Sequence, residues 1–403
     1  MSHEFIKYDD PIFSVWRENY LNGSAEHRYC IIQDFDRENQ LKSDYLGREI
    51  LELVQNADDQ KSDYLEIKVI TIGVDPQIII TNKGPNTIPF SRDGFRSIMR
   101  PGLSSKKLVT GSFTEGETIG NKGFGFRSLL NWSSHIEIDS AGLHCDFDEK
   151  TAWGKWAEIK SKLEDDGCDD LLKNCLAVAK DKCPISLLAI PEVKTANTDL
   201  HSTSITIHFD QTLEDNIISQ INDLRPNILF FVRNIKQISI IINDDSPRIM
   251  DRSEWEEKKR ISPDVHISRC ILSDCDSQNA WLKYNFQDED SEIAIAWRED
   301  GSPVEKEKRF FYSFFPTKVF LNLPCIVHAS VNLDAARNRI LPSDYNKNIM
   351  QTVGKCLVKL AEYIAECDEA IGVCDWRPYK MLFFLQDGLQ EPLNYLIAGG
   401  CTI

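Results

Sequence analysis

Residues 47–60 have the periodicity of a helix with one polar side and one apolar side. At about 100° per residue, Asn56 lies at about +40° and Asp59 at about −20° relative to Glu52. The aliphatic side chains fall on the opposite side of the helix, and they are Ile50, Leu53, Val54 and Ala57. The spacing therefore predicts an amphipathic helix that covers an apolar surface, with an acid, an amide and a second acid in one narrow stripe. A surface helix with a solvated polar side is the alternative interpretation.

Short alternating segments follow this helix along the chain. Residues 65–72 alternate between apolar and polar, and residues 77–81 form a second strand directly afterwards. Further strands are expected at 134–139, 204–209 and 237–242 and within 248–340, and further helices near 153–180, 213–224 and 344–370. Strands and helices mixed in this way predict an α+β chain, and the turn composition of residues 243–247 indicates a domain boundary.

The length and charge of the chain limit its domain number and its partners. A chain of 403 residues is long enough for two or three domains. Its 46 basic and 63 acidic residues give a formal net charge of −17, which repels phosphate backbones and anionic lipid. Direct binding to nucleic acid is therefore not expected. No stretch reaches the roughly 20 apolar residues of a membrane span, and the amino terminus lacks the apolar core of a signal peptide. We expect no membrane partner and a cytoplasmic location.

The cysteines give no sign of a disulfide framework or a metal site. Twelve cysteines are scattered from Cys30 to Cys401, and no two of them form a C-x-x-C pair. The most closely spaced ones lack the neighbouring histidine or cysteine that a zinc site needs. We therefore expect reduced thiols that act as small hydrophobic residues.

A glycine-rich segment precedes an apolar run in the first third of the chain. Its glycines Gly120, Gly123 and Gly125 let backbone N–H groups approach an anion, and a helix after them would direct its positive end at phosphate. The segment does not fit G-x-x-x-x-G-K-[ST], because Lys122 falls between the glycines. Structural glycines in a tight turn are the alternative. Further polar residues flank strands upstream and downstream, among them Asn82 and Thr203.

Several separated motifs occur together in one order along the chain. They are Glu52-Leu-Val-Gln-Asn56-Ala-Asp-Asp59, Asn82-Lys-Gly84, Ile119-Gly-Asn-Lys-Gly-Phe-Gly-Phe-Arg-Ser128 and Ser202-Thr203-Ser-Ile. This order resembles the GHKL ATPase superfamily, whose Bergerat fold is shared by gyrase B, the ninety-kilodalton heat-shock chaperone, histidine kinases and MutL. Within the superfamily the chaperone branch is most similar, and residues 82–128 resemble the sacsin-type proteins.

The resemblance implies a domain layout. Residues 1–245 would form a two-layer Bergerat sandwich, a mixed sheet covered by helices on one face, with a lid at about 95–125. Residues 246–343 would form a smaller α/β domain like the chaperone's middle segment, and residues 344–403 a helical segment. In the middle domain, Arg337 would reach the γ-phosphate of a nucleotide, with Arg339 as its competitor.

The resemblance also implies the roles of individual residues. Glu52 would be the general base, Asn56 would ligate Mg²⁺ and Asp59 would organise the pocket. The remaining nucleotide-binding residues would be Asn82, Gly84, Lys106, Gly120, Lys122, Gly123, Phe124, Gly125, Phe126 and Thr203. Asn82 departs from the family, which usually has an aspartate there to read adenine. An amide can donate as well as accept, so this departure affects base preference more than phosphate chemistry.

By this resemblance the chain is an ATP-binding, Mg²⁺-dependent and slowly hydrolysing conformational switch, chaperone-like or associated with defence or DNA transactions. The alternative is a nucleotide-dependent scaffold or clamp with little or no hydrolysis. A histidine kinase is disfavoured, because neither His3 nor His27 lies in a convincing dimerisation helix. A homodimer formed on ATP binding and a protein partner or client are further expectations.

Overall fold

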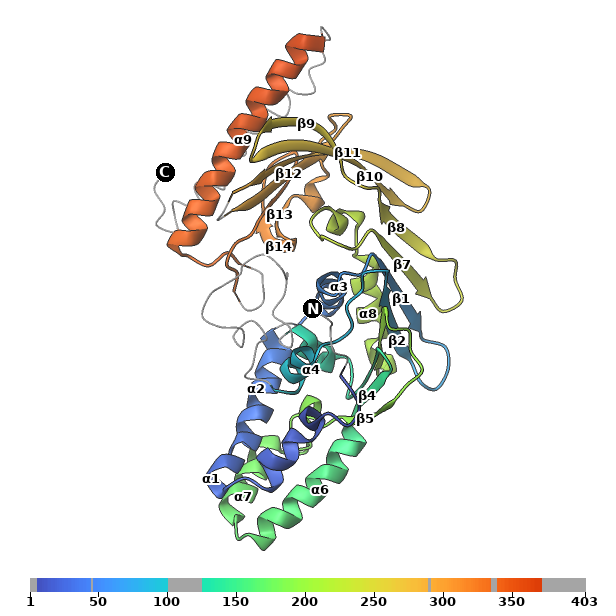
Figure 1. Ribbon diagram of the computed structural model, residues 1–403, viewed down its shortest axis with the longest axis vertical. Coiled ribbons are helices and arrows are strands. Elements are labelled where there is room, and N and C mark those ends of the chain that lie inside the picture. The colour runs from blue at the N-terminus through green and yellow to red at the C-terminus, as the bar shows by residue number, and fades with distance from the viewer. Residues whose placement is uncertain (1–5, 45, 101–124, 289–290, 335–338, 372–403) are drawn as a thin grey trace. The chain divides into compact units, whose positions relative to one another are not determined.

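The computed structural model describes residues 6–44, 46–100, 125–288, 291–334 and 339–371 (Figure 1). Its internal contacts divide the chain into two compact units. The first unit comprises residues 1–224 and 233–248, and the second comprises residues 225–232 and 249–403. Each unit contains both strands and helices.

The first unit is built on a mixed sheet with strand order β7-β1-β2-β6-β3-β4-β5. The strands are β1 (Tyr64–Ile70), β2 (Gln77–Lys83), β3 (His135–Ser140), β4 (Leu143–Asp148), β5 (Glu192–Thr195), β6 (Ser202–His208) and β7 (Gln237–Ile242). β1 pairs with β7 in parallel, and the other neighbouring pairs of this sheet are antiparallel. The strands expected at 65–72, 77–81, 134–139, 204–209 and 237–242 all form, with shifted ends.

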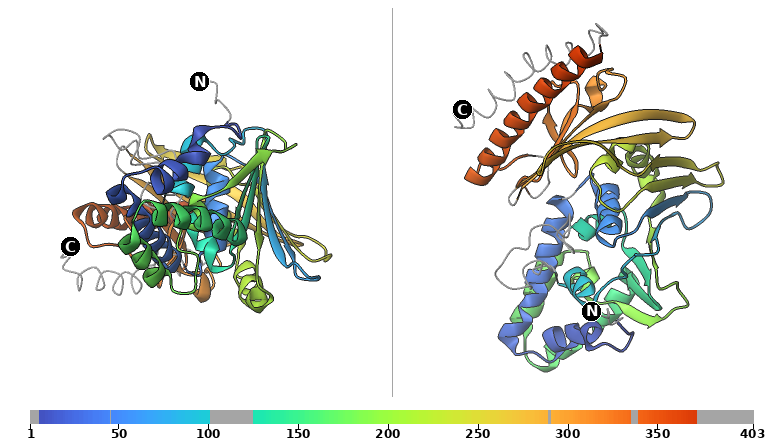
Figure 2. Two further views of the ribbon diagram at one scale, coloured as in Figure 1. Left: turned by 90° about the horizontal axis from the view of Figure 1, so that it is seen from below. Right: turned by 45° about the horizontal axis from the view of Figure 1, so that its top comes forward.

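The first unit also has helices, and some of them lie on one face of this sheet. The helices are α1 (Ala25–Arg28), α2 (Cys30–Asp44), α3 (Glu49–Asp59), α4 (Arg92–Met99), α6 (Glu149–Asp165), α7 (Asp169–Ala179) and α8 (Glu214–Asn222). β1, β2, β3 and β6 bury alternate residues, which places aliphatic side chains on one face and half-exposed polar ones on the other. Two views of the ribbon show α2 and α3 on the same side of the strands (Figures 1 and 2). The predicted α+β class, with a mixed sheet and helices on it, is confirmed.

A separate helical layer packs in the first unit around aromatic side chains. Trp16 and Tyr20, in the turns before α1, pack with Trp156 of α6 and Ile31 of α2 in one buried cluster. α6 and α7 correspond to the helical segment expected near 153–180. The sequence predicts no element for most of α2, although this helix is 15 residues long.

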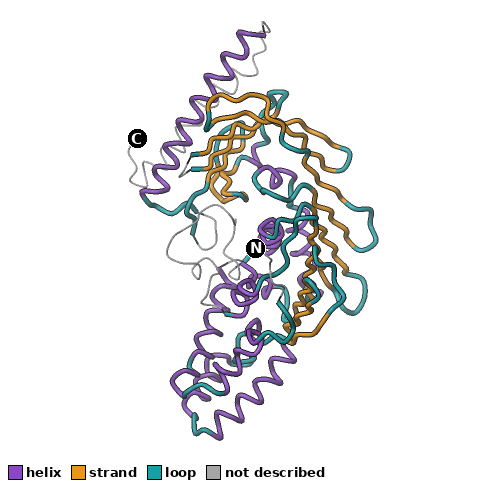
Figure 3. The backbone as a smooth tube through the Cα atoms, in the orientation of Figure 1, coloured by secondary structure: helices purple, strands orange, loops and turns teal. Residues whose placement is uncertain are grey.

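The strands of the second unit have the order β14-β13-β15-β12-β11-β10-β8, and β9 also pairs with β10. Strands and helices are distinguished by colour in Figure 3. The strands are β8 (Arg248–Arg252), β9 (Glu256–Ser262), β10 (Val265–Asp274), β11 (Ser277–Gln287), β12 (Glu292–Arg298), β13 (Phe310–Ser313), β14 (Phe315–Phe320) and β15 (Ile326–Ala329). The long helix α9 (Asp344–Ile371) packs against these strands. Ile349, Val353 and Leu357 of α9 share a buried cluster with Tyr284 and Val327 of the strands.

Two further observations concern cysteines and membranes. The nine cysteines whose side chains the structure describes, from Cys30 to Cys356, are free thiols, as the sequence predicts for them. Among the described helices, none is both long and apolar enough to cross a lipid bilayer.

Candidate functional site

Helix α3 carries the predicted acid–amide–acid stripe, and this stripe is buried. The aliphatic side of the helix is in the core, where Ile50 is 1% and Val54 0% exposed. The polar side is nearly as buried, because Glu52 is 5% and Asp59 9% exposed. Asn56 is half-buried. The interpretation of α3 as a surface helix with a solvated polar side is therefore wrong.

The Glu52 carboxylate lies against the backbone of Gly125. A Cβ atom added to Gly125 would overlap this carboxylate and would lie 2.9 Å from Glu52 Cγ. Only glycine allows the chain to pass so close to the acid. The second oxygen, Oε1, is 3.9 Å from Nε of Arg48, one turn earlier on α3. The structure thus brings together the predicted general base and the last of the three predicted glycines.

A steric restriction also explains why residue 84 is a glycine. A Cβ atom at this position would overlap the Asp63 side chain and lie 3.0 Å from the Asp63 backbone nitrogen. Gly84 directly follows β2, so it lets the chain leave the sheet beside the start of β1. In the described part of the chain, Gly84 allows the backbone after β2 to pass close to the backbone at Asp63.

Three polar side chains form a row across the covered face of the sheet. Asn82 of β2 is paired in register with Thr203 of β6, and Thr203 is paired with Ser140 of β3. All three are 2% exposed or less. Thr203 Oγ1 and Ser140 Oγ are 2.9 Å apart and share a hydrogen bond. The row therefore places two predicted site residues and one unpredicted residue side by side.

Asn82 is hydrogen-bonded to the end of α3. Its Nδ2 donates to Gln60 Oε1 at 2.9 Å and to Ser62 Oγ at 2.6 Å. Thr87 Oγ1 donates to the same Ser62 oxygen at 3.1 Å. Gln60 caps the carboxyl end of α3, and the helix rises about 12 Å between residues 52 and 60. One rigid helix therefore connects the acid beside Gly125 with the polar row on the sheet.

Sequence reasoning missed Gln60, Ser62, Thr87 and Ser140. A signal existed for Ser140, because it occupies the position after Ile136 and Ile138 where the alternation of β3 places a buried aliphatic residue. Asn82 and Thr203 also occupy inward positions of their strands. A polar residue at an inward strand position marks a buried hydrogen-bond network.

The two aspartates at the end of α3 differ in role. Asp58 accepts hydrogen bonds from the backbone nitrogens of Arg233, Asn234 and Ile235 at 2.7–3.0 Å. Burial raises the pKa of the Asp58 carboxyl, and these N–H groups act in the opposite direction. Asp58 therefore anchors residues 233–235 before β7, whereas its neighbour Asp59 lies on the predicted stripe.

The segment after the glycines is a 3₁₀ helix, η3 (Gly125–Asn131), rather than the α-helix that the anion-binding interpretation expects. Phe126 is buried, with 2% of its surface exposed. Arg127 is completely buried and donates to the carbonyl oxygens of Ser97 at 3.2 Å and Ile98 at 2.5 Å. Burial lowers the pKa of Arg127 to about 10, which the negative charges of Glu38 and Asp34 partly oppose. Arg127 therefore joins η3 to the end of α4.

Several predicted residues lie outside the described residues. They are Lys106, Gly120, Lys122, Gly123, Phe124 and Arg337. Of the expected lid at 95–125, the structure describes only residues 95–100, which belong mainly to α4, and Gly125. Arg339, the alternative to Arg337, donates its backbone N–H to Asp334 Oδ1 at 3.1 Å.

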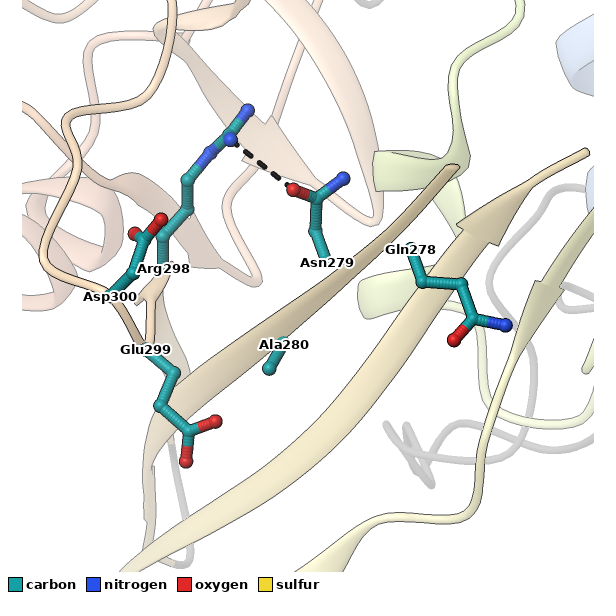
Figure 4. Close-up of a pocket in the computed structure, with 6 residues that line it drawn as sticks. All are labelled: Gln278, Asn279, Ala280, Arg298, Glu299 and Asp300. Carbon is teal, nitrogen blue, oxygen red and sulfur yellow. Dashed lines mark hydrogen bonds between the residues drawn. The ribbon is translucent and has the colours of Figure 1, made fainter. Parts of the chain in front are cut away.

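Two hollows of the described surface lie away from the predicted site residues. One of about 330 Å³ in the second unit is lined by Gln278, Asn279, Ala280, Arg298, Glu299 and Asp300 (Figure 4). In it Arg298 Nη1 is 3.4 Å from Asn279 Oδ1, and Arg298 also pairs with Glu305. A smaller one of about 140 Å³ in the first unit is lined by residues that include Tyr20, Asp34 and Arg96. Neither contains a predicted site residue, so the candidate site is defined by its buried polar groups and not by either hollow.

Comparison with known proteins gives one partial relationship. Over 100 residues, 25% of this chain, the sequence is 40% identical to Protein NO VEIN of Arabidopsis thaliana. The matched segment is only 3% of the length of that protein. No family model matches the sequence.

Proposed function

We propose that the first unit binds ATP with Mg²⁺ and hydrolyses it slowly, as a member of the GHKL superfamily with a Bergerat-type fold. The observation that carries this proposal is the placement of the buried Glu52 carboxylate against Gly125, at one end of a helix whose other end holds Asn82. The order of the motifs supports the same assignment, because Glu52, Asn82, Gly125 and Thr203 belong to four different segments of the chain.

Glu52 and Asn56 supply the chemistry at the phosphate end. A buried carboxylate can accept the proton of a water molecule that attacks a phosphoryl group. Asn56 follows one helical turn later and is half-buried, so its amide oxygen is accessible to a hard cation that prefers oxygen ligands. Bound Mg²⁺ would bridge phosphate oxygens and neutralise their charge. Gly125 keeps the space beside the acid free of a side chain.

Asn82 and its neighbours supply the base end. The hydrogen bonds of the Asn82 side chain to Gln60 and Ser62 are both donated by Nδ2. This leaves Oδ1 as the acceptor, which is the role that an aspartate plays toward the exocyclic amine of adenine. The network around Asn82 therefore favours adenine over guanine, despite the missing carboxylate.

The test compares ATP binding with ATP turnover in the full chain. Calorimetric titration with ATP, GTP and a non-hydrolysable ATP analogue in Mg²⁺ measures binding, and phosphate release measures hydrolysis. We expect ATP to bind more tightly than GTP. We expect Glu52→Ala to bind ATP within a few-fold of the wild type but to lose about 100-fold or more in turnover. Glu158→Ala on α6, where the acid is 45% exposed, is the matched control and should change neither.

Three results would contradict this proposal. Failure of the wild type to bind ATP would remove the assignment to the superfamily. An ATP complex without hydrolysis would instead favour the nucleotide-dependent clamp, and hydrolysis at the same rate in Glu52→Ala would remove Glu52 as the general base. The partner or client and any ATP-linked dimerisation stay predictions of the resemblance.

A further inference from the structure

The uncovered face of the first sheet carries a group of two histidines and two carboxylates, His135, Glu137, Asp146 and His208, here called the His135 cluster. His135 of β3 is paired in register with His208 of β6, and Glu137 of β3 with Asp146 of β4. The alternation of each strand turns the intervening aliphatic residues to the covered face. The cluster is therefore on the opposite face of the sheet from Asn82 and Thr203.

The side-chain atoms of the cluster have the spacing of metal ligands. His135 Nε2 is 3.2 Å from Asp146 Oδ1 and 3.5 Å from Glu137 Oε1. His208 Nε2 is 3.7 Å from the same Glu137 oxygen. Zinc–nitrogen and zinc–oxygen bonds of about 2.0–2.2 Å place the ligand atoms of a tetrahedral ion about 3.3–3.6 Å apart. These three separations fall in or next to this range. The ligand atoms of His135, Glu137 and His208 all lie within 4.8 Å of one another, and Asp146 approaches this group through His135.

Three of these atoms have no hydrogen-bond partner in the described part of the chain. His135 Nε2, Asp146 Oδ1 and His208 Nε2 are each shielded from solvent and make no hydrogen bond there. Such buried polar atoms cost free energy unless another group satisfies them. A cation held by His135, Glu137 and His208 would satisfy both histidine nitrogens, and Asp146 Oδ1 lies 3.2 Å from the first of them.

Asp75 determines which nitrogen of His208 faces the cluster. Nδ1 of His208 is 2.9 and 3.0 Å from the two Asp75 oxygens. Because a carboxylate accepts, Nδ1 donates, and a neutral His208 then directs the lone pair of Nε2 toward Glu137. A carboxylate that orients a histidine in this way is the usual outer partner of a metal-ligating imidazole.

The two imidazole rings are stacked. Their centroids are 4.1 Å apart and their planes differ by 7°. Each nitrogen lone pair lies in its own ring plane, so binding one ion turns the rings away from parallel.

We propose that the His135 cluster binds one divalent transition-metal ion, with Zn²⁺ as its best-fitting occupant. Two imidazoles and two carboxylates are a borderline-soft ligand set that suits Zn²⁺ better than Mg²⁺ or Ca²⁺. The two carboxylates balance the charge of the ion. The thiol of Cys145, next to Asp146 in β4, belongs to the covered face of the sheet and is not part of the cluster.

The test measures Zn²⁺ binding by the full chain. Calorimetric titration with zinc chloride, with thiols kept reduced by a phosphine, gives the affinity, and thermal unfolding with and without Zn²⁺ gives a second readout. We expect His135→Gln and His208→Gln to weaken binding about tenfold or more and to abolish the Zn²⁺-dependent rise in Tm. Glu137→Gln, close in shape to the wild type, provides a variant in which folding is preserved. His201→Gln, outside the cluster, is the control.

The outcomes are decisive in both directions. Absence of Zn²⁺ binding by the wild type overturns the proposal. Binding that is unchanged in both histidine variants but is removed by alkylation of the cysteines assigns the ion to thiols and overturns it as well. ATP binding should be the same in the wild type and the cluster variants, because the cluster and the candidate nucleotide site are on opposite faces of the sheet.

Discussion

The carboxylate of Glu52 occupies the space that a side chain at residue 125 would need. Glu52 lies in the first turn of α3 and Gly125 begins η3, so the contact joins two segments that are far apart in the chain. The contact explains why the segment before the apolar run ends in glycine, independently of any bound anion. It also makes residue 125 a direct probe of the acid.

Gly125→Ala should destabilise the first unit. The added methyl group would overlap the Glu52 carboxylate, and the acid or the backbone of η3 has to move. We expect a loss of about 1–3 kcal/mol in the free energy of unfolding, measured by denaturant titration. Gly154→Ala is the matched control, because a Cβ atom there meets nothing within 4 Å and the residue is in the middle of α6. That variant should be neutral or more stable by up to about 1 kcal/mol.

Combining Gly125→Ala with Glu52→Ala separates the clash from other effects of the alanine. Removal of the carboxylate frees the space, so the double variant should lose less stability than the two single variants together. Additive losses would show that the Glu52 carboxylate is not what prevents a larger residue at position 125.

Asn82→Asp should destabilise the chain although it restores the residue common in the GHKL family. A carboxylate cannot donate to Gln60 Oε1 and Ser62 Oγ, so Gln60 Oε1 loses its donor from residue 82 and Ser62 Oγ keeps only the hydrogen bond from Thr87. We expect a cost of about 2 kcal/mol at neutral pH. The cost should shrink as the pH falls, since the protonated acid can donate one hydrogen bond and carries no buried charge. Asn216→Asp on the exposed side of α8 is the control, and an equal loss in both variants contradicts the prediction.

Lys283 of β11 should make the stability of the second unit depend on pH in the alkaline range. Burial and the positive charge of Arg252 lower the pKa of this lysine from 10.5 to about 8. Its Nζ lies 3.9 Å from the centroid of the Trp255 ring and 3.5 Å from the Phe230 carbonyl oxygen. The unfolded chain therefore binds more protons than the folded chain between these two pKa values, and stability rises with pH across this window.

The measurement is the free energy of unfolding of the wild type and of Lys283→Met at several pH values from about 8 to 10. The wild type should gain about 1–3 kcal/mol relative to the variant over this range. Comparison with the variant removes the contributions of other groups that titrate at the same pH. A constant difference between the two proteins would show that Lys283 keeps its ordinary pKa.

Regular patterns made part of the fold predictable. The aliphatic residues of α3 and the alternation of β1 and β2 each specify an element through local spacing, and these elements form where they are expected. Helix α2 was not predictable in this way, because its stability comes from aromatic and aliphatic contacts with α6 and α7. Its buried Glu38 accepts from Ser186 and the backbone of Leu187, so the helix depends on partners distant in sequence.

The candidate site was predictable as a set of residues but not as a network. Helical spacing turns Asp58 about 100° away from Asp59. It does not indicate that Asp58 accepts hydrogen bonds from the backbone of residues 233–235. Gln60 and Ser62 belong to the site because Asn82 donates hydrogen bonds to both, and no local sequence pattern indicates these contacts. The His135 cluster was missed entirely, because its four side chains come from three strands and meet only through the pairing of β3 with β4 and β6.

The parallel pairing of β1 with β7 has a consequence for synthesis on the ribosome. Ile67 in the interior strand β1 receives its second neighbour, Ile240, only after about 240 residues have been made. Until then one edge of β1 has no β-bridge to β7 and could pair with another nascent chain. A newly made protein of this kind should therefore need protection from aggregation until translation has passed β7.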